Sequence, residues 1–255
     1  MSPPSTADGS EPSFPSERTV LEPGCERCPA LVESRECISW GTGPLDASIV
    51  VVGEAPGYGT PEADRWQGGN WTGKAYTSRH SGRRIRRLLE AIGYGEDAYY
   101  TNAVKCFPAS EAPRASKSAS GDAASEAPRT SKSASGDAAS PGPDEPTSNR
   151  EPTPEERTNC RTHLLTELER VDPAVVLATG KHATTTVLEA EDRALDGFLE
   201  TVLEPIDCDR LDVCLLPILH PSYQDVWIGR LGYEPDTYRE AIAETLANCL
   251  EAADE

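Results

Sequence analysis

The chain has 255 residues, which is enough for one α/β domain of about 200 residues with tails and an insertion. No stretch approaches the ~20 apolar residues that a membrane-spanning helix needs, and residues 1–18 lack the apolar core of a signal peptide, so we expect a cytoplasmic protein. Acidic residues outnumber basic ones 43 to 24, which gives a net charge of −19. This balance excludes a broad DNA-coating surface, although it is compatible with a small DNA site.

The excess of acidic residues would make the chain repel itself in dilute buffer. At molar salt the Debye length falls to roughly 3 Å, and this repulsion is largely screened. Because only five of the basic residues are lysines, we interpret the composition as halophilic, an adaptation to a saline cytoplasm. A mildly acidic mesophilic protein is the alternative.

Four short runs of β-branched and apolar residues are typical of buried strands in a parallel sheet. Helical patterns lie between them, and Thr153-Pro-Glu-Glu156 has the form of a capping box with proline at the first helical position. This alternation predicts an α/β fold, a three-layer α/β/α sandwich around a central, mainly parallel four-stranded sheet, with ligands bound at the carboxyl ends of the strands. The predicted strands are 47–52, 99–104, 174–178 and 213–219, and the predicted helices are 81–92, 153–171, 181–190 and 236–252.

Residues 110–139 form a tandem repeat of a 15-residue unit, and the two copies differ only at Ala115 and Thr130. The repeat has no Leu, Ile, Val or aromatic residue, so it cannot bury a core. We predict a disordered low-complexity insertion over 110–148, with a regulatory or DNA-tethering arm as the alternative reading. The rest of the chain is predicted to be a disordered tail, 1–20, and a single domain made of 21–109 and 149–252.

Four segments that carry candidate chemistry lie where strand ends are predicted. They are Gly53-Glu-Ala-Pro-Gly57, Trp71-Thr-Gly-Lys-Ala75, Thr101-Asn-Ala-Val-Lys-Cys106 and His220-Pro-Ser222. Each is a weak signal alone, because a Gly/Pro turn after a strand is common and a lone Asn or His is more often structural than catalytic. Their order carries the information.

Two further motifs complete that order: Cys25-Glu-Arg-Cys28 precedes the four segments, and Asn149-Arg-Glu-Pro-Thr-Pro-Glu-Glu156 is followed by Cys160. The whole series resembles the family 4 uracil-DNA glycosylases, over residues 21–250 apart from the insertion. The resemblance implies a DNA repair enzyme that flips uracil out of single- or double-stranded DNA and hydrolyses its N-glycosidic bond. Monomeric action is the simplest expectation.

The resemblance assigns roles to single residues. Asn102 would read uracil, because its amide can match both O4 and N3–H; Trp71 would stack on the flipped base, although a core tryptophan is a serious alternative. His220 would donate to uracil O2 as negative charge develops there. Glu54 would line the base-binding site, and either Glu62 or Asp64 could orient the attacking water. The other substrate-binding candidates are Gly53, Ala55, Pro56, Gly57 and Ser222.

The cysteines divide into two groups. Cys25, Cys28, Cys106 and Cys160 match the family's cluster ligands, so the resemblance implies a 4Fe-4S cluster; structural zinc would suit four thiolates equally by spacing alone. Cys37, Cys208, Cys214 and Cys249 show no such pattern and are expected to be core or surface thiols.

Two segments are candidates for DNA contact. Arg83, Arg84, Arg86 and Arg87 concentrate positive charge, either as a solvated helix face or as phosphate contacts. The segment 223–227 after His220-Pro-Ser222 could insert a side chain where the base leaves the stack. A glycosylase for another deaminated base and a non-catalytic iron–sulfur protein that binds damaged DNA remain alternatives. A covalent DNA-crosslinking relative fits less well, because no basic insertion precedes His220.

Overall fold

The structure, a computed structural model, describes residues 12–63, 65–110 and 149–253. Its centre is one sheet with the strand order β2-β1-β3-β5-β4. The three central pairings are parallel, and β4 pairs antiparallel to β5 at the edge. The strands are β1 (Ile49–Gly53), β2 (Ala98–Asn102), β3 (Val175–Thr179), β4 (Ile206–Cys208) and β5 (Val213–Ile218).

The predicted fold class is confirmed, and the four predicted strands are all present. The sheet has a fifth strand, β4, which the sequence analysis missed. This strand is only three residues long, and its residues are half-buried, exposed and buried in turn. A segment so short and so mixed in polarity gives no hydrophobic pattern to read.

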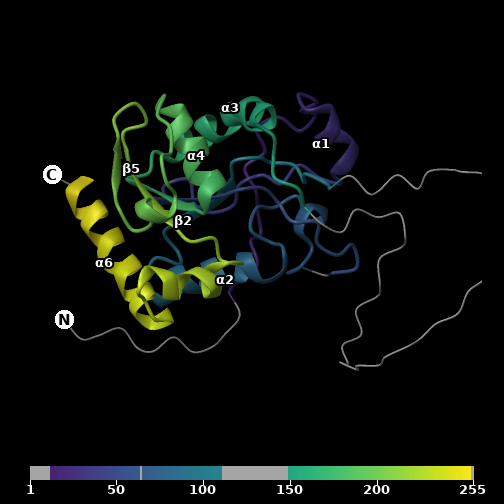
Figure 1. Cartoon of the computed structure of the whole chain (residues 1–255). Helices are drawn as coiled ribbons and strands as arrows, with labels where there is room; N and C mark the ends of the chain where they lie inside the picture. Colours follow the sequence, from purple (N-terminus) through teal and green to yellow (C-terminus); the bar gives the residue numbers. More distant parts are fainter. Residues whose placement is uncertain (1–11, 64, 111–148, 254–255) are drawn as a thin grey trace, which may run out of the picture.

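Helices cover both faces of the sheet and form the outer layers of the sandwich (Figure 1). One core cluster lies under α2 and α6, through Ile85, Leu89 and Ile242; the other lies under α3 and α4, through Leu164 and Val187. The α-helices are α1 (Pro29–Ser34), α2 (Arg79–Ala91), α3 (Pro154–Val171), α4 (Lys181–Ala190), α5 (Gln224–Trp227) and α6 (Pro235–Ala253), and the 3-10 helices are η1 (Gly69–Trp71), η2 (Leu199–Thr201) and η3 (Ile228–Leu231).

The N-terminus of α3 has the predicted capping box. The Thr153 hydroxyl accepts from the Glu156 amide at 3.2 Å, and the Glu156 carboxylate accepts from the Thr153 amide at 2.8 Å. Arg150 also holds this carboxylate, at 2.7 and 2.5 Å. The helix start is therefore fixed from both sides, which sets the position of Cys160 two turns along α3.

The two ends of the predicted insertion lie next to each other. Ala109 and Asn149 form an antiparallel bridge, and the Arg150 amide donates to the Pro108 carbonyl at 3.0 Å. Residues 111–148, on which the predicted repeat and its disorder fall, lie outside the described residues. The main chain on either side of them is therefore already paired.

The predicted N-terminal tail falls partly outside the described residues, which begin at position 12. Its remaining part lies against the domain. Phe14 packs edge-to-face on Trp66 with ring centroids 5.1 Å apart, and Arg18 donates to the Gly73 carbonyl at 2.9 Å. Lys74 Nζ lies 2.5 Å from the Pro15 carbonyl oxygen. These contacts join residues 14–18 to the segment that carries Trp71.

Candidate active site

The carboxyl ends of four parallel strands meet at one edge of the sheet. Gly53, the last residue of β1, pairs in register with Asn102, the last residue of β2. Thr179 at the end of β3 pairs with Ile218 at the end of β5, two residues before His220. The strand register therefore brings the predicted glycine-rich, asparagine and histidine segments to the same edge, where α/β folds bind ligands.

Asn102 is buried at this edge, with 4% of its surface exposed. Its side-chain nitrogen Nδ2 has no hydrogen-bond partner in the described part of the chain. A buried amide donor without a partner is costly, by about 1–3 kcal/mol. The arrangement is therefore suited to a ligand that brings its own acceptor to Nδ2.

The Gly53-to-Gly57 loop packs directly on Asn102. A Cβ atom at Gly53 would lie 2.4 Å from Asn102 Oδ1, so a side chain at this position would displace the Asn102 amide. The carbonyls of Gly53 and Glu54 accept from the amides of Ala103 and Val104 at 2.7 and 2.9 Å. Farther along, Pro56 O accepts from Asn149 and Gly57 O accepts from the Asn70 amide. These bonds hold Gly53 and Glu54 against the residues that follow β2 and anchor Pro56 and Gly57 to Asn149 and Asn70.

His220 is held by its neighbours in one tautomer. The Ser222 amide donates to His220 Nδ1 at 3.2 Å, so in the neutral ring the proton is on Nε2. Burial lowers the pKa of His220 to about 4, and His182 acts in the same direction. The imidazole is therefore neutral at physiological pH and offers Nε2–H as a donor. Gly180, at φ 93°, lies next to His220. A Cβ at position 180 would lie 3.0 Å from the His220 Cβ, so glycine lets the two segments pack closely.

Glu54 is half-buried at the same edge. Burial raises the pKa of its carboxyl above the ordinary value; His182 opposes this shift, Glu151 adds to it, and Arg157 opposes it. His182 Nε2 lies 3.3 Å from Glu151 Oε1. His182 was not among the predicted site residues, although its position three residues after the end of β3 follows the same strand-end rule that located Asn102.

Trp71 lies beside the end of the glycine-rich loop. Its ring packs edge-to-face on Tyr58, the residue after Gly57, with centroids 5.9 Å apart. The indole nitrogen Nε1 is buried and has no hydrogen-bond partner among the described side chains and backbone. Trp71 is half-buried, so part of the side chain remains accessible.

Helix α2 braces the segment that follows His220. Ser81 and Ser222 are joined through their hydroxyls at 2.7 Å, and Arg84 donates to the Pro221 carbonyl at 3.1 Å. Arg84 also contacts both carboxylate oxygens of Asp225, at 3.0 and 2.5 Å. The Ser222 side chain thus contacts helix α2, while its amide orients His220.

The four predicted DNA-contacting arginines do not form one surface array. Arg86 is 8% exposed; its guanidinium lies 3.8 Å from the centroid of the Tyr100 ring and donates to Thr42 Oγ1 at 2.9 Å. Arg84 is committed to Asp225 and Pro221, as above. Of this group Arg87 is exposed and Arg83 is half-buried. In contrast, Tyr223 and Val226 are 64% and 63% exposed; they lie in the segment 223–227 that was predicted to insert a side chain into the base stack.

A buried ion pair lies behind the end of β2. Lys105 Nζ contacts Glu167 Oε2 at 2.5 Å, and both side chains are at most 1% exposed. Lys105 also donates to the Asn102 carbonyl at 2.7 Å and to Thr101 Oγ1 at 2.6 Å, while Glu167 accepts from Thr101 and Tyr99. The pair therefore fixes the end of β2 to α3. Lys105 lies within the Thr101-to-Cys106 motif, but no role was predicted for it.

The four predicted ligand cysteines gather in a third core cluster with Leu31, Ile38, Trp40 and Val104. Cys25 and Cys28 come from the loop before α1, Cys106 follows β2, and Cys160 lies on α3. A nitrogen atom lies close to each sulfur. His163 Nε2 is 3.5 Å from Cys25, Asn159 Nδ2 is 3.6 Å from Cys28, Arg35 Nη1 is 3.4 Å from Cys106, and the Lys105 amide is 3.2 Å from Cys160.

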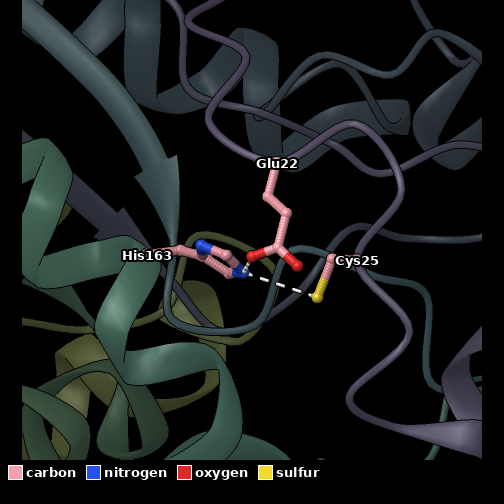
Figure 2. Close-up of side chains that lie close together, drawn as sticks. All are labelled: Glu22, Cys25 and His163. Atoms are coloured by element: carbon pink, nitrogen blue, oxygen red, sulfur yellow. Dashed lines mark hydrogen bonds and ion pairs between the residues drawn. The ribbon is translucent and has the colours of Figure 1, made fainter.

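The closeness of the sulfurs can be compared with the geometry of a single tetrahedral metal ion. Tetrahedral zinc lies about 2.3 Å from each sulfur, which places the sulfurs about 3.8 Å apart. Among the described residues, the one group of three metal-ligating side chains within 4.8 Å of one another is Glu22, Cys25 and His163 (Figure 2). No three of the four cysteine sulfurs are so close. The four cysteine sulfurs are therefore not gathered as closely as the ligands of one tetrahedral zinc ion.

Two cavities of the described structure lie away from this edge. One of about 420 Å³ is lined by residues 13–19 and 43–45 with Arg86 and Tyr100, and another of about 530 Å³ lies around Lys181 and Glu189. Neither is lined by Asn102, Glu54 or His220.

The fold and the strand-end geometry agree with the comparison with known families. Residues 40–246 match the family model of the uracil DNA glycosylase superfamily. The chain belongs to this superfamily and is thus a DNA repair hydrolase that excises uracil by cleaving its N-glycosyl bond.

Curated relatives of two types are similar to the chain. A type-4 uracil-DNA glycosylase of Thermotoga maritima is 27% identical over 200 residues, covering 78% of this chain and 77% of that protein. A type-5 uracil-DNA glycosylase of Pyrobaculum aerophilum is 28% identical over 248 residues, covering 89% and 90%. A type-4 enzyme of Archaeoglobus fulgidus is 27% identical and covers 71% of this chain and 69% of its own length. No helix in the described ranges is long and apolar enough to cross a membrane.

Proposed function

We propose that the chain is a family 4 type, iron–sulfur uracil-DNA glycosylase that acts as a monomer on both single- and double-stranded DNA inside the cell. The observation that carries the proposal is Asn102, a buried amide at the carboxyl edge of the sheet whose Nδ2 has no partner. Extruded uracil supplies both groups that this amide needs, an O4 acceptor for Nδ2 and an N3–H donor for Oδ1. Cytosine presents a donor and an acceptor in the opposite order.

His220 then acts on the bond that breaks. As the bond between base and sugar lengthens, negative charge develops on uracil, and the neutral Nε2–H of His220 is a fixed donor for O2. One such positioned donor contributes about 3–4 kcal/mol to transition-state stabilisation. Because Nδ1 accepts from the Ser222 amide, Nε2–H is the one donor of the neutral ring.

The remaining substrate contacts follow from position. Gly53, Ala55, Pro56 and Gly57 form the loop against Asn102, and Trp71 offers a face at the end of that loop for stacking. Glu54 belongs to the same edge, where burial raises its pKa and its carboxyl can limit the space beside uracil C5. Of the two predicted water-orienting groups, Glu62 is exposed and Asp64 lies outside the described residues.

Cys25, Cys28, Cys106 and Cys160 would hold the cluster, and the chemistry of four thiols with nearby nitrogen atoms fits it. When bound, a 4Fe-4S group would supply a rigid, redox-capable joint between the N-terminal loop, the end of β2 and α3. We expect purified protein to contain iron and labile sulfide in similar amounts, without zinc. Stoichiometric zinc in their place would contradict the cluster.

The function is tested with an oligonucleotide that carries one labelled uracil, single-stranded or paired with guanine, in molar potassium chloride because we propose a halophilic protein. Alkaline cleavage of the abasic product reports base release. We expect uracil release that falls by at least ~100-fold in His220→Ala and Asn102→Ala. Asn248→Ala, an exposed asparagine on α6, is the matched control and should retain activity.

Two outcomes would redirect the proposal. Release of hypoxanthine but not uracil would assign the enzyme to another deaminated base. Full-strength DNA binding without release of any base, by cluster-loaded protein, would replace the enzyme with a binding role.

A further inference from the structure

Two cysteines outside the cluster set form a pair of their own. Cys214 is on β5 and Cys249 is near the end of α6, and their sulfur atoms are 2.6 Å apart. This separation is close to the ~2.05 Å of a disulfide bond. Both residues are free thiols in the structure. The pair is therefore placed to form a bond without rearrangement of the two elements.

The backbone on both sides of this pair is well anchored. The Cys214 amide donates to the Ala174 carbonyl at 2.9 Å, which fixes β5 against the start of β3. Cys249 is buried, at 5% exposure, in the same core cluster as Tyr238, Ile242 and Leu246 of α6. The anchoring keeps the sulfurs facing each other, while the half-buried side chain of Cys214 leaves the pair accessible to a small reagent.

Helix α6 also supports the catalytic edge from its other end. The Leu219 amide, next to His220, donates to the Tyr238 hydroxyl at 2.9 Å. The helix therefore contacts β5 near both strand ends, through Tyr238 at one and Cys249 at the other. A covalent bond at the second contact would fix the helix that holds Leu219.

We propose that Cys214 and Cys249 are a redox modification site, a dithiol that small-molecule disulfides convert into an intrachain disulfide. One protein thiolate attacks a sulfur of the reagent, forms a mixed disulfide and releases the first reagent thiol. The second protein thiolate then attacks the protein-bound sulfur and releases the second reagent thiol. The two protein thiols are oxidised, the reagent is reduced to two thiols, and these carry away the two protons.

The interaction within the pair supports this chemistry. The Cys214 thiol donates to the Cys249 sulfur, which lowers the pKa of Cys249 and raises that of Cys214. A thiolate is the attacking species in disulfide exchange. The pair therefore contains both a favoured nucleophile and a partner in contact with it.

Peptide mapping tests the site directly and does not depend on the proposed function. Full-length, cluster-loaded protein is treated with oxidised glutathione under anaerobic conditions, blocked with an alkylating agent and digested with trypsin. Cleavage separates the three nearby cysteines, because Cys208 falls in 194–210, Cys214 in 211–230 and Cys249 in 240–255. We expect a linked peptide that joins 211–230 to 240–255, with a mass about 2 Da below the sum of the reduced peptides because two thiol protons are lost.

Cys208→Ala is the matched control. Cys208 is buried on β4, the strand next to Cys214, but it packs in the core cluster on the opposite face of the sheet. The linked peptide should persist in Cys208→Ala and disappear in Cys249→Ala, where Cys214 should carry glutathione alone. Oxidation should raise the melting temperature by roughly 5–10 °C, with uracil release at moderate temperature unchanged.

Three results would overturn the site: alkylation of both thiols after oxidation, separate glutathione adducts on Cys214 and Cys249 of the unsubstituted protein, or a link that involves Cys208. A linked peptide in a protein that releases no uracil would leave the site standing and reject the proposed function alone.

Discussion

Asn102 is the side chain that we propose selects the base. Its donor Nδ2 is buried without a partner, so the cost of this atom is recovered when an acceptor arrives. A base that presents a donor at the same place leaves both groups unpaired. Sites built on buried hydrogen bonds discriminate more strongly than sites built on shape alone.

Replacing Asn102 by aspartate should reverse part of that preference. A carboxylate only accepts, so it repels uracil O4 and suits the amino group of cytosine. We expect kcat/KM for uracil to fall by ~10²–10³-fold and the ratio of cytosine to uracil release to rise, measured on paired oligonucleotides. Asn248→Asp on the exposed face of α6 adds the same charge as a control. An unchanged ratio would remove Asn102 from base selection.

His220 should titrate far below an ordinary histidine. The expected pKa is about 4, because burial and His182 both disfavour the charged ring. The contribution of this group to the free energy of unfolding is therefore lost as the pH falls from ~6.5, where the unfolded ring gains a proton, to about 4. Below that pH both states are protonated, and the lost contribution is not regained. NMR of the imidazole signals should show one midpoint near 4 that is absent in His220→Asn. A midpoint near 6.5 would contradict the neutral-donor role.

At the residue scale, the sequence could predict the residues that belong to the ordered series of motifs and few others. Asn102 and His220 lie at the strand ends where their motifs predicted them, because parallel strands bring their carboxyl ends together. His182 also follows a strand end, but a histidine at the second position of a helix belongs to no motif that would mark it as a site residue. Arg86 was predicted at a helix surface, and its burial against Tyr100 depends on a neighbouring strand that local sequence does not show.

The joint between β2 and α3 is the element-scale feature on which both proposed centres depend. Lys105 holds the Asn102 carbonyl with its ammonium group, and its amide contacts Cys160. Glu167, two turns after Cys160 on the same helix, completes the buried pair. Displacing Lys105 would therefore disturb base reading and the cysteine group together.

Lys105→Met should destabilise the fold by about 3–5 kcal/mol, since it leaves the Glu167 carboxylate buried without its counter-charge. The double variant Lys105→Met/Glu167→Met should recover much of this loss, because the uncompensated charge is removed. Denaturant unfolding measures stability, and iron content measures the cysteine group. Lys181→Met, at an exposed lysine, is the control. A double variant as unstable as the single one would show that packing, and not charge, sets the effect.

Element prediction succeeded where local chemistry decided the structure. The capping box fixed the start of α3 at Pro154, and continuous β-branched runs located β1 and β3 within one or two residues. Strand β4 forms because its backbone pairs with the edge of β5, and a sequence of three residues does not indicate this pairing. The braces from α2 to the segment after His220 are tertiary for the same reason.

The charge of the whole molecule sets the conditions in which it folds and binds. With 43 acidic and 24 basic residues, self-repulsion is strong in dilute buffer and screened at high salt. We expect the melting temperature to rise steadily with potassium chloride up to molar concentration. Sucrose at matched water activity is the control, since it carries no charge. A melting temperature that is independent of salt would contradict halophilic adaptation.

The last whole-molecule prediction concerns the predicted insertion. Ala109 and Asn149 form a bridge, and the Arg150 amide donates to the Pro108 carbonyl, so the domain itself holds the two ends of the insertion together. Replacing residues 111–148 by a four-residue Gly/Ser turn shortens the loop about tenfold, which should stabilise folding by up to about 2 kcal/mol through a smaller closure entropy. Denaturant unfolding measures this gain, and uracil release should stay within about twofold.

The kinetic readout of that deletion separates the two readings of the repeat. A segment that only extends a surface loop makes no contact with DNA, so kcat and KM should both be unchanged. A DNA-tethering arm would instead add binding energy equally to ground and transition states, and its removal would raise KM with kcat constant. Exchanging 111–148 for a scrambled sequence of equal composition is the matched control, because it keeps length and charge. If the deletion raises KM and the scrambled segment returns KM to its original value, tethering depends on charge and length and not on the repeat itself.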